Sequence, residues 1–183
     1  EVHEIEGSVF AGASGNIPAR LHVGTHYPRS FTTREACRLH YAEFMGTYGH
    51  LTAAVPINLY CIAKDESLVD FGTYRQVLNG QVEYLTVHDP AEFGLQNVEG
   101  ALLTGERHIV IAKAKAHFEE RLAGHVKFWA APDLVDDPRW DWTLDASFCA
   151  RDSAGIDRYE PCLVVLLEGP TDKAVTVMDG PFP

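Results

Sequence analysis

The sequence predicts a mostly β, α+β fold in which an antiparallel curved sheet or barrel of about nine strands packs on one main helix. Short apolar or alternating segments follow one another along the chain, with turn residues between them. Two of these segments are joined by Asn79-Gly80, and an earlier segment carries a helix capping box. No domain linker interrupts the pattern, so we expect a single domain, 1–183.

Charge and composition limit the classes of partner. The net charge is −11 and the lysines and arginines are scattered singly, which argues against nucleic-acid binding. No apolar run is long enough to cross a membrane, and no secretory signal is expected. The four cysteines form no Cys-x-x-Cys pair and are expected to be free thiols of a cytoplasmic protein. The expected partner is a small-molecule substrate or ligand, and homo-oligomer formation stays open.

The strongest local signal is the Asn-Gly pair at 79–80. Both central residues of a type I′ turn need positive φ, which asparagine and glycine tolerate best. Strands at 68–78 and 81–87 are therefore predicted to form a hairpin, with Arg75 opposite Tyr84. Polar residues interrupt both faces of this hairpin. This pattern is expected either when the strands line a polar pocket or when the rest of the protein covers each face only in part.

A main helix is predicted to begin after Thr32. The capping box places Thr32 at the N-cap and Glu35 three residues later. An apolar stripe then repeats at helical spacing, formed by Cys37, Tyr41, Phe44 and Tyr48. His40 and Glu43 lie one turn apart on its flank, so they form either an acid/base pair or a boundary histidine beside a carboxylate.

The remaining segments are predicted mostly as strands, with one ambiguous case. Segment 107–118 contains helix formers, but its alternation of apolar and polar residues favours a strand. Segment 89–105 is predicted as a loop or as one short helix at 90–93. The other predicted strands are 2–10, 20–25, 57–63, 124–130, 140–151, 163–167 and 174–178.

His22 and His26 form the first candidate site. A His-x-x-x-His pair on a helix is typical of a metal site, but Gly24 and Pro28 argue against a helix here. On an extended chain the two histidines would lie about 13 Å apart, too far to share a metal unless the strand ends between them. The pair is therefore interpreted as acid/base residues, as metal ligands or as ordinary turn residues.

The function that the sequence favours is an enzyme of the lyase, isomerase or cyclase type. It would act on a small organic molecule by acid/base chemistry without a nucleotide cofactor, since no cofactor motif is found. The predicted catalytic residues are His22, His26, Tyr74 and His117. The predicted substrate-binding residues are Arg29, Lys115, Tyr84 and Trp142. No metal ligand is assigned; the alternatives are a non-catalytic β-barrel carrier of small molecules and a metal-dependent enzyme that uses the His22/His26 pair.

Overall fold

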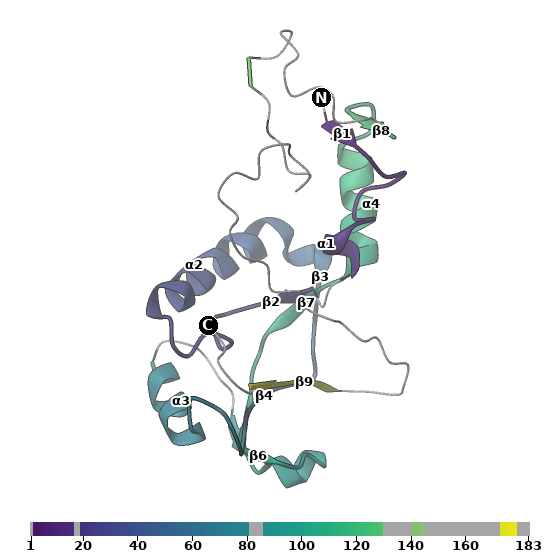
Figure 1. The fold of residues 1–183 in the computed structure, drawn as a ribbon. Helices are drawn as coiled ribbons and strands as arrows, with labels where there is room; N and C mark the ends of the chain where they lie inside the picture. The colour runs from purple at the N-terminus through teal and green to yellow at the C-terminus, as the bar shows by residue number, and fades with distance from the viewer. Residues whose placement is uncertain are drawn as a thin grey trace.

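The computed structural model describes residues 2–16, 19–80, 86–129, 141–142, 144 and 173–178. Within these residues the chain forms nine strands in three open sheets, together with α-helices and two short 3-10 helices (Figure 1). The predicted α+β class and the strand number are therefore confirmed for this part of the chain. The predicted barrel is not confirmed, because none of these sheets closes on itself. No helix of the described segments is both long and apolar enough to cross a bilayer.

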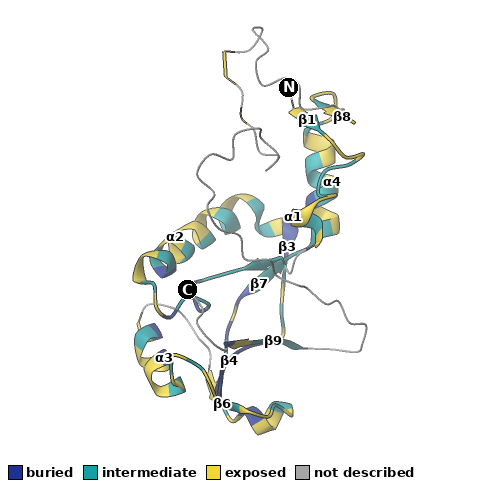
Figure 2. Cartoon of the chain, in the orientation of Figure 1, coloured by how far each residue is buried: buried dark blue, intermediate teal, exposed yellow. Residues whose placement is uncertain are grey.

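The largest sheet has four strands in the order β5-β6-β4-β9. These strands are β4 Ile57–Ala63, β5 Thr86–His88, β6 Val98–Leu103 and β9 Lys173–Met178. The central strand β4 pairs antiparallel with β6 and parallel with β9. Figure 2 shows it in the dark blue of buried residues. The predicted strand at 57–63 is confirmed with the same bounds, and the one at 174–178 corresponds to β9.

The apolar core lies on both faces of β4, because successive side chains of a strand point to opposite sides. Tyr60 and Ile62 pack on one face, and Leu59 and Cys61 pack on the other. The residues that join the first cluster are Tyr74, Leu78, Leu102 and Met178. Helix α3 thus covers the face from which Tyr60 projects.

Two smaller sheets complete the strands of the described residues. β7 (Arg107–Ile109) pairs antiparallel with β2 (Arg20–Leu21) and with β3 (Thr52–Ala54). β1 (Val2–Glu4) and β8 (Val126–Phe128) form a parallel pair. The predicted strands at 2–10, 20–25 and 124–130 are therefore present in shortened form.

The main helix is α2, Phe31–Tyr48. Its N-cap is Ser30, whose hydroxyl accepts a hydrogen bond from the Thr33 backbone N–H at 3.3 Å. Thr32, the predicted N-cap, lies inside the first turn, so the prediction is wrong by two residues. His40 Nδ1 and Glu43 Oε2 are 2.7 Å apart on the solvent-exposed surface of this helix. The short helices nearby are α1 Ala13–Asn16 and η1 Gly49–Leu51.

The predicted hairpin at 68–87 is wrong for the part that the structure describes. Residues Phe71–Leu78 form helix α3. Asp70 caps it by accepting a hydrogen bond from the Thr73 N–H at 2.8 Å. Tyr74 and Leu78, four residues apart, are its buried residues, and this helical spacing was the overlooked signal. Residues 81–85 lie outside the described residues.

The prediction for segment 107–118 is right at its start and wrong afterwards. Residues 107–109 are strand β7, whereas Ile111–Arg121 form helix α4. In α4 Ala114 is buried while Ala112 and Ala116 are exposed, so the alternating alanines do not share one buried face. The intrinsic helix propensity of this alanine- and lysine-rich stretch therefore outweighs its two-residue alternation.

Segment 89–105 contains the predicted short helix, η2 Pro90–Phe93, but also the unpredicted strand β6. Gly100 permits this strand to pack, because a Cβ there would overlap the ring of Phe71. The predicted strand at 163–167 lies outside the described residues, as does the one at 140–151 apart from residues 141, 142 and 144. Cys37 and Cys61 are free thiols, as predicted.

Candidate functional site

The carboxylate of Glu106 lies at the centre of a buried polar network. Its side chain is only 1% exposed. Oε1 accepts hydrogen bonds from the backbone N–H of Val23 at 2.9 Å and from the Thr25 hydroxyl at 2.5 Å. Oε2 accepts one from the Tyr60 hydroxyl at 2.7 Å and lies 3.6 Å from Nδ1 of His22. We call these residues the Glu106 network.

Two opposing effects set the ionisation of this carboxyl group. Burial raises the pKa of Glu106, but hydrogen bonds from His22, Thr25, Val23 and Tyr60 lower it and outweigh burial. The net pKa lies below the ordinary value, so Glu106 is a carboxylate near neutral pH. The pKa of Tyr60 is raised mainly by burial and also by the Glu106 carboxylate, so the Tyr60 hydroxyl keeps its proton near neutral pH.

A turn of the chain brings His22 and His26 together. Strand β2 ends at Leu21, and Gly24 has a φ of +105°, a conformation that favours glycine. The Tyr27 N–H donates to the Gly24 carbonyl at 3.1 Å and closes the turn. The two imidazole centroids are 5.4 Å apart. The separation of about 13 Å expected for an extended chain therefore does not apply, because the strand has already ended.

This turn is held against the first turn of α2. A Cβ at Gly24 would lie 3.1 Å from both the Cα and the carbonyl oxygen of Arg34, which is closer than most Cβ contacts in proteins. The buried guanidinium of Arg34 donates to the carbonyl oxygens of Tyr27 at 2.9 Å and Pro28 at 2.7 Å. These contacts fix the backbone on either side of His26.

Two further side chains tie the Glu106 network to its surroundings. Tyr74 of α3 is fully buried and donates its hydroxyl hydrogen to the Thr25 carbonyl at 2.9 Å. Burial raises the pKa of Tyr74 well above its ordinary value. The Arg20 guanidinium lies over the Tyr60 ring, 5.7 Å from its centroid, and donates to the Thr176 hydroxyl of β9.

The two histidines occupy different positions relative to the carboxylate. The side chain of His22 is 30% exposed, so it connects the buried Glu106 with the surface. The pKa of His26 is lowered mainly by burial and also by the neighbouring His22. The opposing effect of the Glu106 carboxylate, which raises this pKa, is smaller. His26 is therefore neutral near pH 7. The site combines an ionised carboxylate, a protonated phenol and imidazole rings, an arrangement suited to binding polar groups and moving protons.

The structure brings together three of the four predicted catalytic residues. His22 belongs to the Glu106 network, His26 lies beside it, and Tyr74 contacts it through Thr25. His117 lies on α4, where its ring packs edge-on against His50 at a centroid distance of 5.1 Å. No contact with the Glu106 network is recorded for His117 within the described residues.

The predicted substrate-binding residues do not gather around the same network where the structure describes them. Lys115 donates to the Ser8 hydroxyl at 3.1 Å. Arg29 is exposed in the turn before α2, and the Trp142 side chain is 93% exposed. Tyr84 lies outside the described residues. A substrate-binding role for these residues stays a prediction.

Glu106, Tyr60 and Thr25 were missed by reasoning from the sequence. Tyr60 reads as one more apolar residue of a buried strand, and Glu106 stands in a polar segment where an exposed glutamate is ordinary. The one available signal is that Thr104-Gly105-Glu106 follows directly after the apolar Ala101-Leu102-Leu103. Strand ends commonly carry functional side chains, but this signal alone names no partner.

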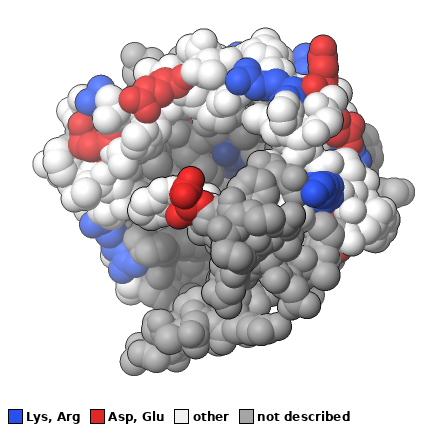
Figure 3. All heavy atoms as spheres, turned by 90° about the horizontal axis from the view of Figure 1, so that it is seen from above, with Lys and Arg blue, Asp and Glu red and all other residues white. Residues whose placement is uncertain are grey.

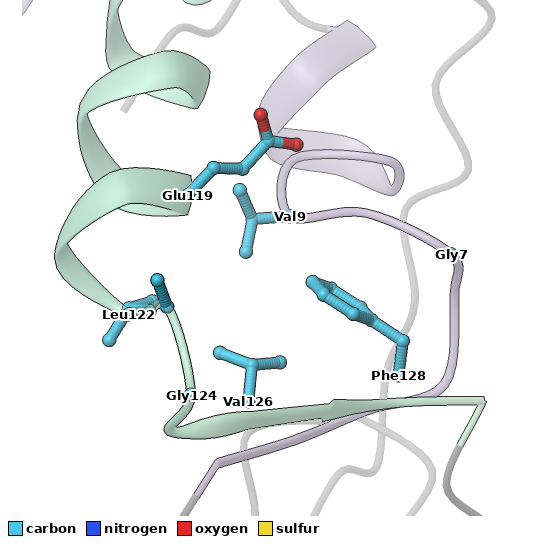
Figure 4. Close-up of a pocket in the computed structure, with 8 residues that line it drawn as sticks. Gly7, Val9, Glu119, Leu122, Gly124, Val126 and Phe128 are labelled. Carbon is cyan, nitrogen blue, oxygen red and sulfur yellow. The ribbon is translucent and has the colours of Figure 1, made fainter.

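A separate pocket of about 250 Å³ lies between α4 and the β1–β8 pair (Figure 4). Val9, Leu122, Val126 and Phe128 line it with apolar side chains, and the Glu119 carboxylate lies at one side. No member of the Glu106 network lines this pocket. It is therefore a distinct, mostly apolar cavity.

Charged and metal-ligating side chains are dispersed where they can be seen. On the face in Figure 3, basic side chains lie among acidic ones and form no single patch, in line with the scattered cations of the sequence. Among the described residues, no group of three or more His, Cys, Asp or Glu side chains is placed to hold a metal ion. His22 and His26 thus have no third ligand of these types in this part of the chain.

The chain is similar to curated proteins that are named FAD-dependent monooxygenases. The chain is 33% identical over 181 residues to the FAD-dependent monooxygenase FPY4 of Fusarium mangiferae, a match that covers 93% of this chain and 49% of FPY4. It is 32% identical over 125 residues to the FAD-dependent monooxygenase kojA of Aspergillus flavus and to the probable FAD-dependent monooxygenase kojA of Aspergillus oryzae. Each of these two matches covers 65% of this chain and 29% of the relative.

The chain therefore spans about half the length of FPY4 and less than a third of the kojA proteins. No family model matches the chain, and no solved structure matches it. The prediction of a lyase, isomerase or cyclase without a nucleotide cofactor is wrong, because the relatives carry the names of FAD-using oxidoreductases. The carrier and metal-enzyme alternatives receive no support from these names.

Proposed function

We propose that this chain forms part of an FAD-dependent monooxygenase that acts on a small organic molecule. The observation that carries the proposal is the 33% identity to FPY4 over 93% of this chain. The Glu106 network adds a polar site at which a small organic substrate would bind. It offers an imidazole, a phenol and a carboxylate, held in place by the turn after β2, by β4 and by the loop before β7.

The chain lacks the glycine-rich turn that usually holds the pyrophosphate of FAD. The pyrophosphate of a dinucleotide is usually bound by a G-x-G-x-x-G turn between a strand and a helix. In the whole sequence no two glycines stand two residues apart, so this fingerprint is absent from the 183 residues. The pocket of about 250 Å³ between α4 and the β1–β8 pair is also smaller than ordinary ligand sites of about 300–1,000 Å³.

The proposed contribution of this chain is therefore to the substrate side of the enzyme. His22 is the member of the Glu106 network whose side chain reaches the surface, and the rings of His26 and Tyr27 lie beside it. These three rings form a partly exposed surface over a buried carboxylate. A small molecule bound there would meet polar ring atoms and aromatic edges together, which suits recognition of a polar organic substrate.

The test is made on the natural protein, purified from its own cells through an affinity tag placed at the genomic locus. The expected result is a yellow protein that releases FAD on denaturation and transfers one atom of labelled oxygen gas to an organic product in cell extract. A colourless protein that takes up no added FAD would overturn the proposal. The 183-residue chain produced alone is the comparison, and we expect it to bind less than about a tenth of an equivalent of FAD because it lacks the glycine fingerprint.

A cytoplasmic location and self-association belong to the same proposal. The free thiols of Cys37 and Cys61 support a reducing compartment, since oxidising compartments favour disulfides. Formation of homo-oligomers has no contact in support of it and is left to a mass measurement in solution.

A further inference from the structure

We propose that Nε2 of His22 is the acceptor that binds a hydroxyl group of the substrate, and that Tyr60 and Glu106 are positioning residues that direct the hydrogen of the neutral imidazole to Nδ1. The inference rests on the proposed function only in taking the ligand to be its small organic substrate. It deepens that function by naming the substrate class, a neutral molecule that carries a hydroxyl group.

The direction of each hydrogen bond in the network follows from Glu106. Its carboxylate can only accept, so the Tyr60 hydroxyl must donate its one hydrogen to Oε2 at 2.7 Å. The Tyr60 oxygen then has only lone pairs left for Nδ1 of His22, which lies 3.1 Å away. That nitrogen must therefore carry the hydrogen, and it is also 3.6 Å from Oε2. A neutral imidazole protonated at Nδ1 has a bare lone pair at Nε2.

The position of this lone pair is open to a ligand. The His22 side chain is 30% exposed while Glu106 is 1% exposed, so the outer part of the ring faces away from the carboxylate. Every polar contact recorded for His22 in the described part of the chain is made by Nδ1. Nε2 thus remains available as a hydrogen-bond acceptor, and an acceptor selects a donor such as a hydroxyl group.

The charges around the ring disfavour a carboxylate or phosphate at the same place. Glu106 is ionised directly behind His22, and His26 is kept neutral by burial. Arg20 lies over the Tyr60 ring and donates to Thr176, and the Arg34 guanidinium donates to the carbonyl oxygens of Tyr27 and Pro28. The Tyr27 ring is inclined by 75° to the His22 ring at a centroid distance of 6.3 Å. A neutral hydroxyl group avoids the repulsion that an anion would meet from Glu106.

The network also supports proton transfer from the bound hydroxyl group. The O–H bond breaks, its electron pair stays on the substrate oxygen, and the proton forms an N–H bond at Nε2. For an acidic hydroxyl group, such as that of a phenol or an enol, the product pair is a phenolate or enolate beside an imidazolium. The new positive charge is stabilised by the Glu106 carboxylate through Tyr60 and directly at 3.6 Å, as a carboxylate stabilises the histidine of other acid/base pairs.

The first test reads the tautomer of His22 by nitrogen NMR on protein labelled in its histidines. His22→Asn assigns the signal, and we expect a protonated Nδ1 and a bare Nε2 above pH 8. Glu106→Gln should invert this pattern. The Gln oxygen would accept from Val23 and Thr25, its amide would donate to the Tyr60 oxygen, and the Tyr60 hydrogen would turn to Nδ1. A protonated Nε2 in the natural protein, or no inversion in Glu106→Gln, overturns the proposal.

Tyr60→Phe keeps the experiment decisive if Glu106→Gln does not fold. This variant retains the buried ring and removes only the bridging oxygen. We expect the His22 signal to change from a single tautomer to a mixture or to protonation at Nε2. An unchanged signal would show that Tyr60 does not position the ring.

The second test measures binding of a hydroxyl probe, 4-nitrophenol, against 4-nitroanisole, which has the same ring without the hydroxyl group. We expect 4-nitrophenol alone to bind, with a rise in the yellow phenolate absorbance. His22→Asn, which keeps a donor near the Nδ1 position and lacks Nε2, should weaken binding at least about tenfold. His40→Asn on the surface of α2 is the matched control and should bind as the natural protein does.

Absence of 4-nitrophenol binding, or equal binding by the His22→Asn variant, overturns the assignment of a hydroxyl substrate. Neither test depends on flavin, so the two proposals fail separately. A flavin-free protein with a bare Nε2 would refute the proposed function alone. A flavoprotein with a protonated Nε2 would refute the role of His22 alone.

Discussion

Replacing Glu106 with leucine is expected to lower the free energy of unfolding by about 4 kcal/mol. Leucine accepts no hydrogen bond, so the Val23 N–H and the hydroxyl groups of Thr25 and Tyr60 lose their partner inside the protein. A buried donor without a partner costs about 1–3 kcal/mol. We place the fixed backbone N–H in the middle of this range and the two hydroxyl groups, which can rotate, at its lower end.

The measurement is urea unfolding followed by circular dichroism at pH 7. With a urea dependence of about 2 kcal/mol per molar, a loss of about 4 kcal/mol moves the midpoint down by roughly 2 M. Glu43→Leu is the matched control, because Glu43 is 64% exposed and a surface change should stay within about 0.5 kcal/mol. A midpoint for Glu106→Leu within about 0.3 M of the control would refute the reasoning that Glu106 holds the network together.

Three further predictions concern pH, the turn and the helix cap. Because the folded pKa of Glu106 is below its ordinary value of 4.5, its contribution to stability is complete above the unfolded pKa and disappears as pH falls through the folded pKa. Between pH 7 and pH 3 the urea midpoint should therefore fall more steeply for the natural protein than for Glu106→Leu. An equal fall of the midpoint in both proteins would contradict the lowered pKa of Glu106. Gly24→Ala should lower the free energy of unfolding by about 2 kcal/mol, because alanine disfavours the positive φ at this position and its Cβ would come close to Arg34. The thermal midpoint should therefore fall by about 4–8 °C. Gly12→Ala, which has open space around its Cβ, is the control, and equal midpoints for the two variants would remove the strain argument. Because Ser30 is the N-cap, Ser30→Ala should lower the free energy of unfolding by about 1 kcal/mol, and Thr32→Ala should lower it by about half of that or less. A larger loss for Thr32→Ala in urea unfolding would identify Thr32 as the N-cap instead.

The parts of the fold that were predicted correctly depend on neighbours in the sequence. Strand β4 was found with the correct bounds because seven consecutive residues, Ile57–Ala63, form an almost unbroken apolar run. Helix α2 was found because a capping signal precedes an apolar stripe at helical spacing, although the cap was placed two residues late. Both signals lie within one element and need no information about its partners.

The errors occurred where local signals competed. Asn79-Gly80 is a good hairpin turn, but Asp70 caps a helix whose Tyr74 and Leu78 pack into the core. In segment 107–118 the alternation of alanine and lysine resembled a strand, yet only Ala114 of those alanines is buried. Packing of Tyr74 and Leu78 into the core decided the first case, and the intrinsic helix propensity of the alanine- and lysine-rich stretch decided the second.

The sequence by itself determined the α+β class, the net acidic charge with scattered cations and the central strand β4, and it indicated His22 and His26 as candidate residues. Only the tertiary structure decided that these histidines meet a buried carboxylate. Glu106 is 83 positions from Val23 and 46 from Tyr60, and no local pattern encodes contacts over such separations. A glutamate is usually exposed, because burying its charge is costly without donors. The donors that make this burial possible come from β4 and from the chain after β2, and they reach Glu106 only when the sheets have formed.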